Sequence, residues 1–161
     1  MDEIDRVAGF LERHHLLLAT AESATAGLIV SMLADVPGCA AVLDCGFVTY
    51  SVAAKRSLLG VSAQTIETFG LTSEQVASEM ARGALQRSRA NIVLANTGMA
   101  ASDGELDGVM CFACAAQVEG EVRVVCETRR FNGGRNEVRS AAARHALLHL
   151  PDYYRQMKQR V

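Results

Sequence analysis

The 161-residue sequence has only two prolines, no tryptophan and few aromatic residues, which make up 5% of the chain. It also lacks a long polar tract, since hydrophobic residues make up 50% of the chain and charged residues 21%. This composition argues against a disordered chain and against two domains joined by a linker. We therefore expect residues 1–161 to form a single domain, long enough to bury about two-thirds of its unfolded surface.

An excess of charge of either sign is also absent, because the formal net charge is -2 and the pI is about 6.1. Such a chain has no electrostatic reason to bind nucleic acid, and its few aromatic rings offer no stacking platform for single strands. The apolar runs are shorter than the roughly 18 residues that a membrane span needs. The acidic start "MDEIDRVAGF" is unlike a basic leader, so we expect a cytoplasmic protein.

The five cysteines are an odd number, which argues against a disulfide framework; they are Cys39, Cys45, Cys111, Cys114 and Cys126. Cys111 and Cys114 form a CxxC motif, but the surrounding "GVMCFACAAQV" is typical of a strand. Residues three apart in a strand face opposite ways, which disfavours a zinc or redox site. We expect buried, small apolar residues here, and no metal or cofactor.

Helical and strand patterns alternate along the chain. Helices are predicted at residues 1–14, 25–35, 51–60, 71–88 and 135–150, and strands at 16–19, 40–50, 91–95, 108–118 and 121–131. Ser51 and Gly60 bound the third helix, and Thr72 and Gln75 have capping-box spacing in the fourth. Pro151 bounds the last, before a polar tail that either adds one short helical turn or frays. The last two strands flank "EG" as a hairpin. This order predicts an α/β fold, a three-layer α/β/α sandwich with a mixed, mostly parallel sheet and a late β-hairpin.

Ligands of open α/β sheets gather at the carboxyl ends of strands, and two such joints carry reactive residue types. In "TAESATAG", Ser23 follows a strand and is expected at a helix N-terminus, where free N–H groups stabilise an oxyanion. The simpler alternative is that Ser23 or Thr25 is only an N-cap. In "GFVTYSVAAK", apolar neighbours would desolvate Lys55 and lower its pKa, whereas a solvated lysine and a Tyr50 packed on the core are the simpler alternative.

Two further joints offer groups suited to an anion. Thr97 and Gly98, in the polar loop "ANTGMAASDGELDG", present a hydroxyl and an approachable backbone, although such loops are often simple connections. In "FNGGRNEVR", Arg135 and Arg139 lie one turn apart at the start of a helix, where cations are disfavoured. An anion between the two arginines would explain this arrangement.

In this order, the four joints resemble the carboxy-terminal domain family of the competence/damage-inducible protein CinA, the PncC-type nicotinamide-nucleotide amidohydrolases. The matching stretches are "TAESATAGLI", "LADVPGCAAVLDCGFVTYS", "LLGV", "TSEQVASEMARGAL", the "TG" at Thr97 and Gly98, and "FNGGRNEVR". The resemblance covers nearly the whole chain, and "GFVTYS" after "VPG" at this distance from "TAES" is its most specific part.

The resemblance implies hydrolysis of the carboxamide of nicotinamide mononucleotide (NMN) to nicotinate mononucleotide and ammonia. It makes Ser23 the nucleophile, Lys55 its base and Tyr50 a proton relay or positioning group. A serine with a lysine base suits amide cleavage, because the amine takes the hydroxyl proton and returns it to the leaving ammonia. The implied substrate-binding residues are Glu22, which is also an orienting or structural carboxylate, Thr25, Thr97, Gly98, Arg135 and Arg139.

The sequence departs from the family pattern around these residues. Ala24 and Ala26 replace a cysteine and a glycine, Val52 and Ala53 replace two polar residues, and Gly134 replaces a carboxylate. The loop after Gly98 is shorter and acidic. The methyl group of Ala26 matters if the backbone there needs a positive φ.

Three functions remain open on these grounds. The first is an active amidohydrolase with an altered substrate preference, and the second is a weak or inactive relative that binds a nucleotide or a protein. The acidic side chains Asp103, Glu105 and Asp107 favour the second unless they point away from a bound phosphate. The third is a structural module without a small ligand. The large apolar fraction also predicts a homo-oligomer.

Overall fold

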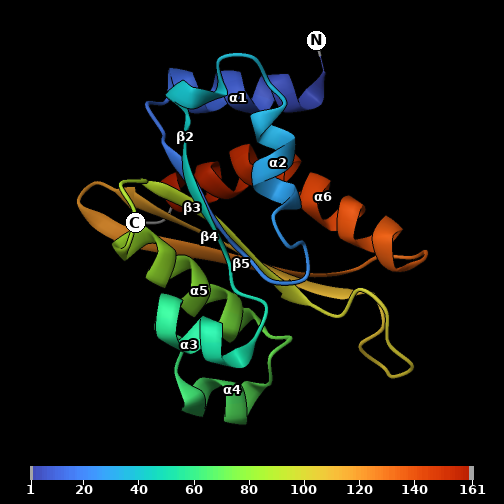
Figure 1. Cartoon of the computed structure of the whole chain (residues 1–161). Coiled ribbons are helices and arrows are strands. Elements are labelled where there is room, and N and C mark those ends of the chain that lie inside the picture. Colours follow the sequence, from blue (N-terminus) through green and yellow to red (C-terminus); the bar gives the residue numbers. More distant parts are fainter. Residues whose placement is uncertain (1, 160–161) are drawn as a thin grey trace.

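The computed structural model describes residues 2–159, which form a five-stranded sheet with helices on both faces (Figure 1). The helices are α1 (Glu3–Arg13), α2 (Leu28–Ala34), η1 (Cys39–Ala41), α3 (Val52–Leu59), α4 (Ala63–Phe69), α5 (Glu74–Gln86) and α6 (Arg135–Gln159). The strands are β1 (Leu18–Glu22), β2 (Leu43–Val48), β3 (Ile92–Gly98), β4 (Val109–Val118) and β5 (Glu121–Arg130). The expected three-layer α/β/α architecture is confirmed. Within residues 2–159, no helix has the length and apolar character needed to cross a membrane.

The sheet has the strand order β2-β1-β3-β4-β5. β1 pairs in parallel with β2 and with β3, whereas β4 is antiparallel to both β3 and β5. Among the described strands, β4 therefore runs against the other four, and β4 and β5 form the predicted hairpin. Because β1 lies between β2 and β3 in parallel, the carboxyl ends of these three strands meet at one edge of the sheet.

Alternation along the strands fills two cores, one on each face of the sheet. In β3, Ile92 and Leu94 pack with α1, α2 and α6, whereas Val93 and Ala95 pack with α3 and α5. Cys111 and Cys114 separate in the same way, with Cys111 in the second core and Cys114 in the first. The prediction that this CxxC pair faces opposite sides of a strand is confirmed, and both residues are free thiols.

Helix α3 is bounded as the sequence predicts and is fixed by a close contact with α5. Ser51 caps its N-terminus by accepting a hydrogen bond from the Ala54 N–H, and Gly60 ends it with a φ of 72°. A Cβ atom on Gly83 of α5 would lie 1.9 Å from the Leu59 carbonyl oxygen, so only glycine allows α3 to approach this closely. The docked helix buries Lys55 and Leu59, which share one face because they are four residues apart.

Several predicted boundaries are wrong. Ser73, rather than the Thr72–Gln75 capping box, caps α5 by accepting a hydrogen bond from the Val76 N–H. β3 continues to Gly98 because pairing with β4 holds the residues that the sequence places in a loop. β1 begins at Leu18 and α2 at Leu28, both later than expected, and the short helix α4 was not predicted although Ser62 caps it.

Pro151 does not end the last helix, which continues to Gln159. A proline inside a helix removes one hydrogen bond and crowds the preceding turn. The residues beyond it are nevertheless held by packing, since Tyr153, Tyr154 and Met157 are buried in the core shared with α1. Burial of these three side chains therefore outweighs the local cost of the proline.

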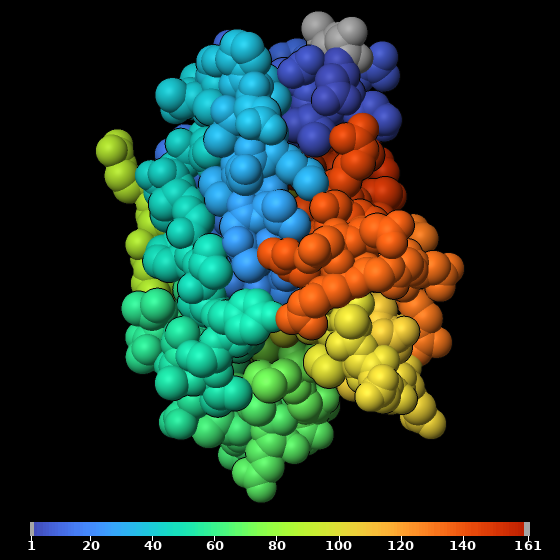
Figure 2. Space-filling model, turned by 45° about the vertical axis from the view of Figure 1, so that its right-hand side comes forward, coloured from blue at the N-terminus to red at the C-terminus, as the bar shows by residue number. Residues whose placement is uncertain are grey.

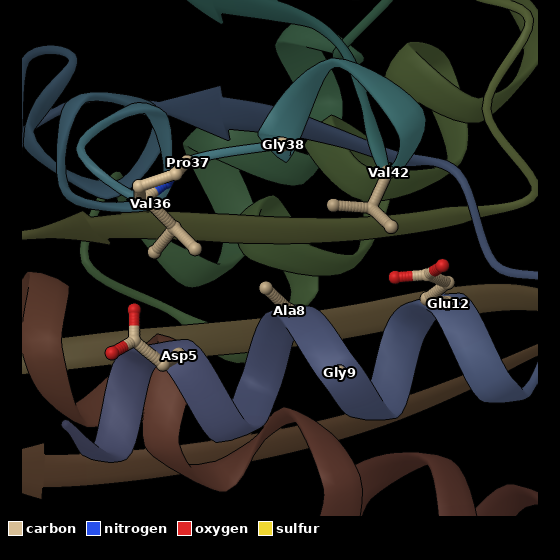
Figure 3. Close-up of a pocket in the computed structure, with 8 residues that line it drawn as sticks. All are labelled: Asp5, Ala8, Gly9, Glu12, Val36, Pro37, Gly38 and Val42. Atoms are coloured by element: carbon tan, nitrogen blue, oxygen red, sulfur yellow. The ribbon is translucent and has the colours of Figure 1, made fainter. Parts of the chain in front are cut away.

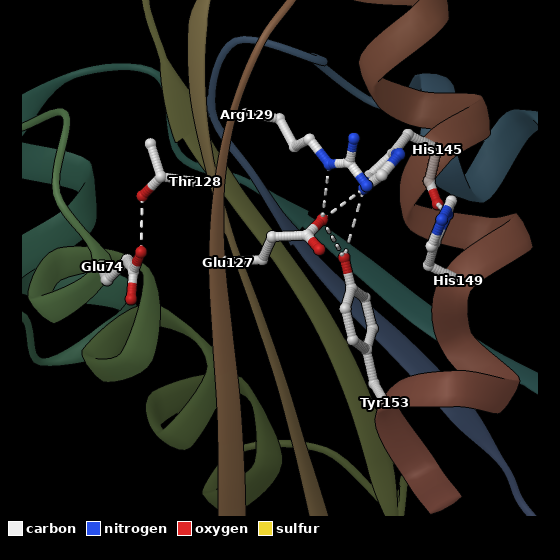
Figure 4. A network of polar contacts seen from close by, with 7 residues as sticks. All are labelled: Glu74, Glu127, Thr128, Arg129, His145, His149 and Tyr153. Carbon is white, nitrogen blue, oxygen red and sulfur yellow. Dashed lines mark hydrogen bonds and ion pairs between the residues drawn. The ribbon is translucent and has the colours of Figure 1, made fainter. Parts of the chain in front are cut away.

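A polar cluster ties β5 to α6 on this face of the sheet (Figure 4). The Glu127 carboxylate contacts His145 Nε2, accepts a hydrogen bond from the Tyr153 hydroxyl at 3.1 Å, and lies 3.5 Å from Arg129 Nε. His149 stacks on His145 with ring centroids 3.9 Å apart. Burial lowers the pKa of His145, aided by the charge of His149, although the hydrogen bond to Glu127 opposes this shift. Burial therefore disfavours the charged form of His145 in the folded protein.

We predict that this cluster makes the protein less stable in mild acid. The His145 pKa is lower in the folded chain than its ordinary value of 6.5, so the unfolded chain takes up a proton first as the pH falls. The stabilisation is complete above about pH 6.5 and is lost below it, with a slope of at most about 1.4 kcal/mol per pH unit for one proton. His145→Gln should remove this slope, measured as the free energy of unfolding in urea between pH 7.5 and 5.

The control is His15→Asn, which changes an exposed histidine whose φ of 55° asparagine tolerates. This variant should keep the slope of the wild type. An equal slope in wild type and His145→Gln would contradict the prediction.

Candidate functional site

The predicted site residues lie at the edge where β1, β2 and β3 end. Ser23 directly follows β1, and Tyr50 lies two residues after β2. Thr97 is the second-last residue of β3, where it pairs with β4. Figure 2 shows the segment between β2 and α3 in turquoise against the start of α6 in orange, with residues 70–75 in green and residues 100–107 in yellow below them. Segments from all four predicted joints therefore meet at one end of the molecule.

The Lys55 ammonium group and the Ser23 hydroxyl are in direct contact. Lys55 Nζ donates to Ser23 Oγ at 2.8 Å, to the Thr49 carbonyl at 2.8 Å and to the Tyr50 carbonyl at 3.1 Å. Lys55 is 2% exposed and Ser23 is 7% exposed. The simpler alternative of a solvated lysine is thus wrong, because the short helix α3 turns this side chain inward.

Burial changes the titration of Lys55. It lowers the pKa of Lys55 below its ordinary value of 10.5, because the charged form loses solvation. No described carboxylate forms an ion pair with it, so no opposing negative charge restores the ammonium form. A neutral amine would donate its two hydrogens to the Thr49 and Tyr50 carbonyls, which leaves its lone pair facing Ser23 Oγ.

Glu22, the last residue of β1, holds the start of α2. Its carboxylate is fully buried and accepts hydrogen bonds from five groups. The donors are the Thr20 and Thr25 hydroxyls and the backbone N–H groups of Gly27, Ile29 and Val30, at 2.7 to 3.1 Å. The charge of Glu22 thereby stands at the N-terminus of α2, where an anion is stabilised.

The segment 23–27, which we call the nucleophile turn after the role predicted for Ser23, differs from the structure that the sequence predicts. Neither Ser23 nor Thr25 is an N-cap, since α2 begins only at Leu28 and Gly27 is its N-cap. The expectation that free N–H groups of this helix face an oxyanion is also wrong, because Glu22 already accepts them. Ala26 has a φ of 47° and Gly27 a φ of 95°, so the turn contains two successive left-handed residues.

Asn96 is a residue of the site that the sequence analysis missed. It is buried in β3, where its carbonyl accepts the Ser23 N–H at 3.0 Å and its Oδ1 accepts the Thr25 N–H at 3.2 Å. A polar residue that continues the apolar run "NIVLA" was the available signal. Asn96 thereby fixes the nucleophile turn to the neighbouring strand.

The two arginines have different positions. Arg139 Nε donates to the Ala24 carbonyl at 2.8 Å, and Arg139 also reaches the Thr25 carbonyl at 3.5 Å. Arg135 instead donates to the Tyr50 hydroxyl at 3.0 Å, in an exposed contact between α6 and the end of β2. Tyr50 is 56% exposed, so the alternative that it packs on the core is wrong. Arg139 is occupied by the nucleophile turn, whereas Arg135 faces solvent.

Thr97 and Gly98 are engaged within the fold. The buried Thr97 hydroxyl donates to the Leu71 carbonyl at 3.0 Å. A Cβ atom on Gly98 would lie 2.5 Å from the Val109 carbonyl oxygen, so glycine is needed for the close pairing of β3 with β4. Both residues therefore make contacts that hold the fold together.

A separate hollow of about 370 Å³ lies between α1 and the connection from α2 to β2 (Figure 3). Its lining residues are Asp5, Ala8, Gly9, Glu12, Val36, Pro37, Gly38 and Val42. The hollow is near the amino end of β2, away from the strand ends that carry Ser23, and its carboxylates would repel a phosphate. It does not belong to the Ser23–Lys55 site.

We predict that Ala26→Gly stabilises the protein. The left-handed φ of Ala26 lowers the free energy of unfolding by about 1–2 kcal/mol, a cost that glycine would avoid. Glycine would itself lower the free energy of unfolding by about 0.4–1 kcal/mol, because it gives the unfolded chain more conformational freedom. The net gain should be roughly 0.5–1 kcal/mol, read as a higher melting temperature. Gly27→Ala, which places a Cβ at a φ of 95°, should lower it; a lower melting temperature for Ala26→Gly would contradict the prediction.

Comparison with known proteins identifies similar chains. A CinA-like protein from Chlorobium phaeobacteroides is 44% identical over 144 residues, which cover 85% of this chain and 34% of that protein. The chain thus spans about a third of the length of that relative. A protein named nicotinamide-nucleotide amidohydrolase PncC, from Enterobacter agglomerans, is 42% identical over 131 residues, covering 79% of this chain and 78% of that protein.

Solved structures have the same fold. The competence/damage inducible protein CihA from Agrobacterium tumefaciens has a TM-score of 0.82 at 40% identity, covering 96% of this chain and 97% of that chain. A CinA superfamily protein from Klebsiella pneumoniae has a TM-score of 0.86 at 32% identity, with 96% of each chain covered. The family model described as the CinA C-terminal domain matches residues 2–154, and this chain belongs to that family.

Proposed function

We propose that the chain is an amidohydrolase that converts NMN to nicotinate mononucleotide and ammonia, with Ser23 as nucleophile and Lys55 as base. The observation that carries this proposal is the 2.8 Å contact between Ser23 Oγ and a buried Lys55 whose pKa is lowered by burial. The name of the PncC relative supports the choice of substrate, since that protein matches over most of its length.

The geometry suits a two-step hydrolysis. In the first step, neutral Lys55 takes the Ser23 hydroxyl proton while Oγ bonds to the carboxamide carbon, and the carbonyl electron pair moves to oxygen. The intermediate then collapses, the C–N bond breaks, and Lys55 returns the proton to the leaving ammonia. In the second step, Lys55 takes a proton from water while the water oxygen bonds to the acyl carbon. The ester C–O bond then breaks, Lys55 returns the proton to Ser23 Oγ, and the released carboxylic acid ionises to the carboxylate.

Arg135 and Tyr50 are the exposed polar groups that suit the phosphate end of the substrate. Both are accessible and joined to each other, so an anion would replace solvent around the guanidinium. The Asp107 carboxylate, whose charge would repel a nearby phosphate, accepts the Ser102 N–H within its own loop. Arg139 is a positioning residue in this proposal, since its bonds to the Ala24 and Thr25 carbonyls hold the nucleophile turn.

A cytoplasmic location and a homo-oligomer, with no nucleic-acid partner, remain part of the proposal, as does a single domain over residues 1–161. Exposed apolar side chains support an oligomer: β2 is an edge strand, and Val48, Val52 and Leu58 near its end are 41–50% exposed. Burial of such a surface between subunits would stabilise the assembly.

The proposal predicts that wild type releases ammonia from NMN and that Ser23→Ala abolishes this release. The melting temperature should change little, because within residues 2–159 Ser23 Oγ forms a hydrogen bond only with Lys55. Since the neutral amine is the active base, kcat/KM should rise with pH through a midpoint below 10.5.

Equal ammonia release by wild type and Ser23→Ala would disprove the assignment of the nucleophile. If neither protein releases ammonia, a melting temperature raised by NMN in both would identify a binding module instead.

A second prediction separates the two arginines by using NMN and nicotinamide riboside, which lacks the phosphate. Arg135→Gln should raise KM for NMN by about 10- to 100-fold, the worth of a charged hydrogen bond of about 1.5–3 kcal/mol, and leave the riboside unaffected. Arg139→Gln should lower kcat for both substrates alike, because it releases the nucleophile turn. A phosphate-specific effect of Arg139→Gln would contradict its positioning role.

A further inference from the structure

The N–H groups of the nucleophile turn are almost all engaged. Those of Ser23 and Thr25 are bonded to Asn96, that of Ala26 to the Ser23 carbonyl at 3.0 Å, and that of Gly27 to Glu22. Among the described residues, the Ala24 N–H has no acceptor. Ala24 is only 6% exposed, and a buried N–H without an acceptor costs free energy. This group is therefore the unpaired donor next to Ser23.

The direction of the Ala24 N–H follows from the peptide that carries it. The Ser23 carbonyl points into the nucleophile turn, where it accepts the Ala26 N–H. The structure contains no cis peptide bond, so the N–H of the same peptide points the opposite way. It thus points out of the turn, on the residue adjacent to the Ser23 side chain.

The peptides on either side of this one are anchored. The Ser23 N–H is bonded to the Asn96 carbonyl, and the next peptide is held at both ends, by Arg139 on the Ala24 carbonyl and by Asn96 Oδ1 on the Thr25 N–H. With its neighbours fixed, the Ser23–Ala24 peptide has little freedom to rotate. A donor fixed before the reaction needs no reorganisation when charge develops.

The backbone donors at the start of α2 are engaged by other bonds. The N–H groups of Gly27, Ile29 and Val30 at the start of α2 are accepted by the Glu22 carboxylate. A developing oxyanion there would have to compete with a full negative charge that is already in place.

We propose that the Ala24 N–H is the oxyanion donor of this site; the inference rests on the proposed function. When Ser23 Oγ bonds to the carboxamide carbon, the carbonyl oxygen gains the electron pair and becomes negative. The Ala24 N–H donates a hydrogen bond to this oxygen. The hydrogen bond weakens again when the C–N bond breaks and the carbonyl reforms. Because the donor belongs to the backbone, the side chain at position 24 does not determine it.

The test removes the donor and keeps the side chain at position 24. Ala24→L-lactate, an amide-to-ester change made by semisynthesis in the full chain, removes the N–H and keeps the side chain. We expect kcat for NMN to fall about 100- to 1,000-fold, the usual effect of losing one such donor, with KM and the melting temperature nearly unchanged. Activity within a few-fold of wild type would overturn the proposal.

The matched control is Ala41→L-lactate, which removes an N–H that donates to the Gly38 carbonyl at 3.2 Å, far from Ser23. This variant loses a hydrogen bond, so its melting temperature should fall while kcat stays unchanged. Ala24→L-lactate should therefore lower kcat alone, whereas Ala41→L-lactate should lower the melting temperature alone. A loss of kcat with the control equal to that with Ala24→L-lactate would overturn the proposal.

A second measurement does not depend on NMN turnover. The probe is 3-pyridylboronic acid, whose boron accepts a serine oxygen to form a tetrahedral adduct. In wild type, the Ala24 amide proton should shift downfield in the ¹H–¹⁵N spectrum when the adduct forms, and Ser23→Ala should show no shift. An adduct without ammonia release from NMN would disprove the substrate and retain the donor. An adduct that leaves the Ala24 amide unchanged, or no adduct and no turnover at all, would overturn the donor.

Discussion

The burial of the Glu22 carboxylate is the constraint on which the site depends. Glu22 ends β1, the strand between β2 and β3, so its position is fixed by the sheet itself. Its five donors bring the start of α2 and two threonine hydroxyls to that point. A charge in this position is stable only while all of these bonds persist. The nucleophile turn between Glu22 and α2 is consequently anchored at both ends, which fixes the position of Ser23.

The position of Lys55 next to Ser23 depends on a different set of contacts. Helix α3 is short, and its place is set by the contact of Leu59 with Gly83 on α5 and by its own caps. These interactions keep the Lys55 side chain buried, although burial disfavours its charged form. The free energy for this burial comes from the packing of the whole helix, not from a partner of opposite sign. The Ser23–Lys55 contact thus arises from two elements that are each positioned by other contacts.

The sequence predicted the order of the main elements and offered Ser23 and Lys55 as candidates, because hydrophobic period and strand-end position are local properties. Their contact was implied only by the family resemblance, since 32 residues separate them. It misplaced the α2 start because the five-donor role of Glu22 depends on groups up to eight residues away. It ended the last helix at Pro151, because the buried tyrosines that override the proline are visible only in the packed structure. The engagement of Arg139 by backbone carbonyls also has no sequence signal.

Helix α6 runs without interruption for 25 residues, through Pro151, from the arginines at its start to the tyrosines packed on α1. At about 1.5 Å per residue it is a rod of roughly 38 Å. A rigid rod transmits axial displacement, so a movement of its tyrosine end against α1 is also a movement of Arg139 against the Ala24 carbonyl. Misplacement by about 1 Å is enough to reduce catalysis by two orders of magnitude. A single helix therefore joins the hydrophobic packing on α1 to the hydrogen bonds that hold the segment beside Ser23.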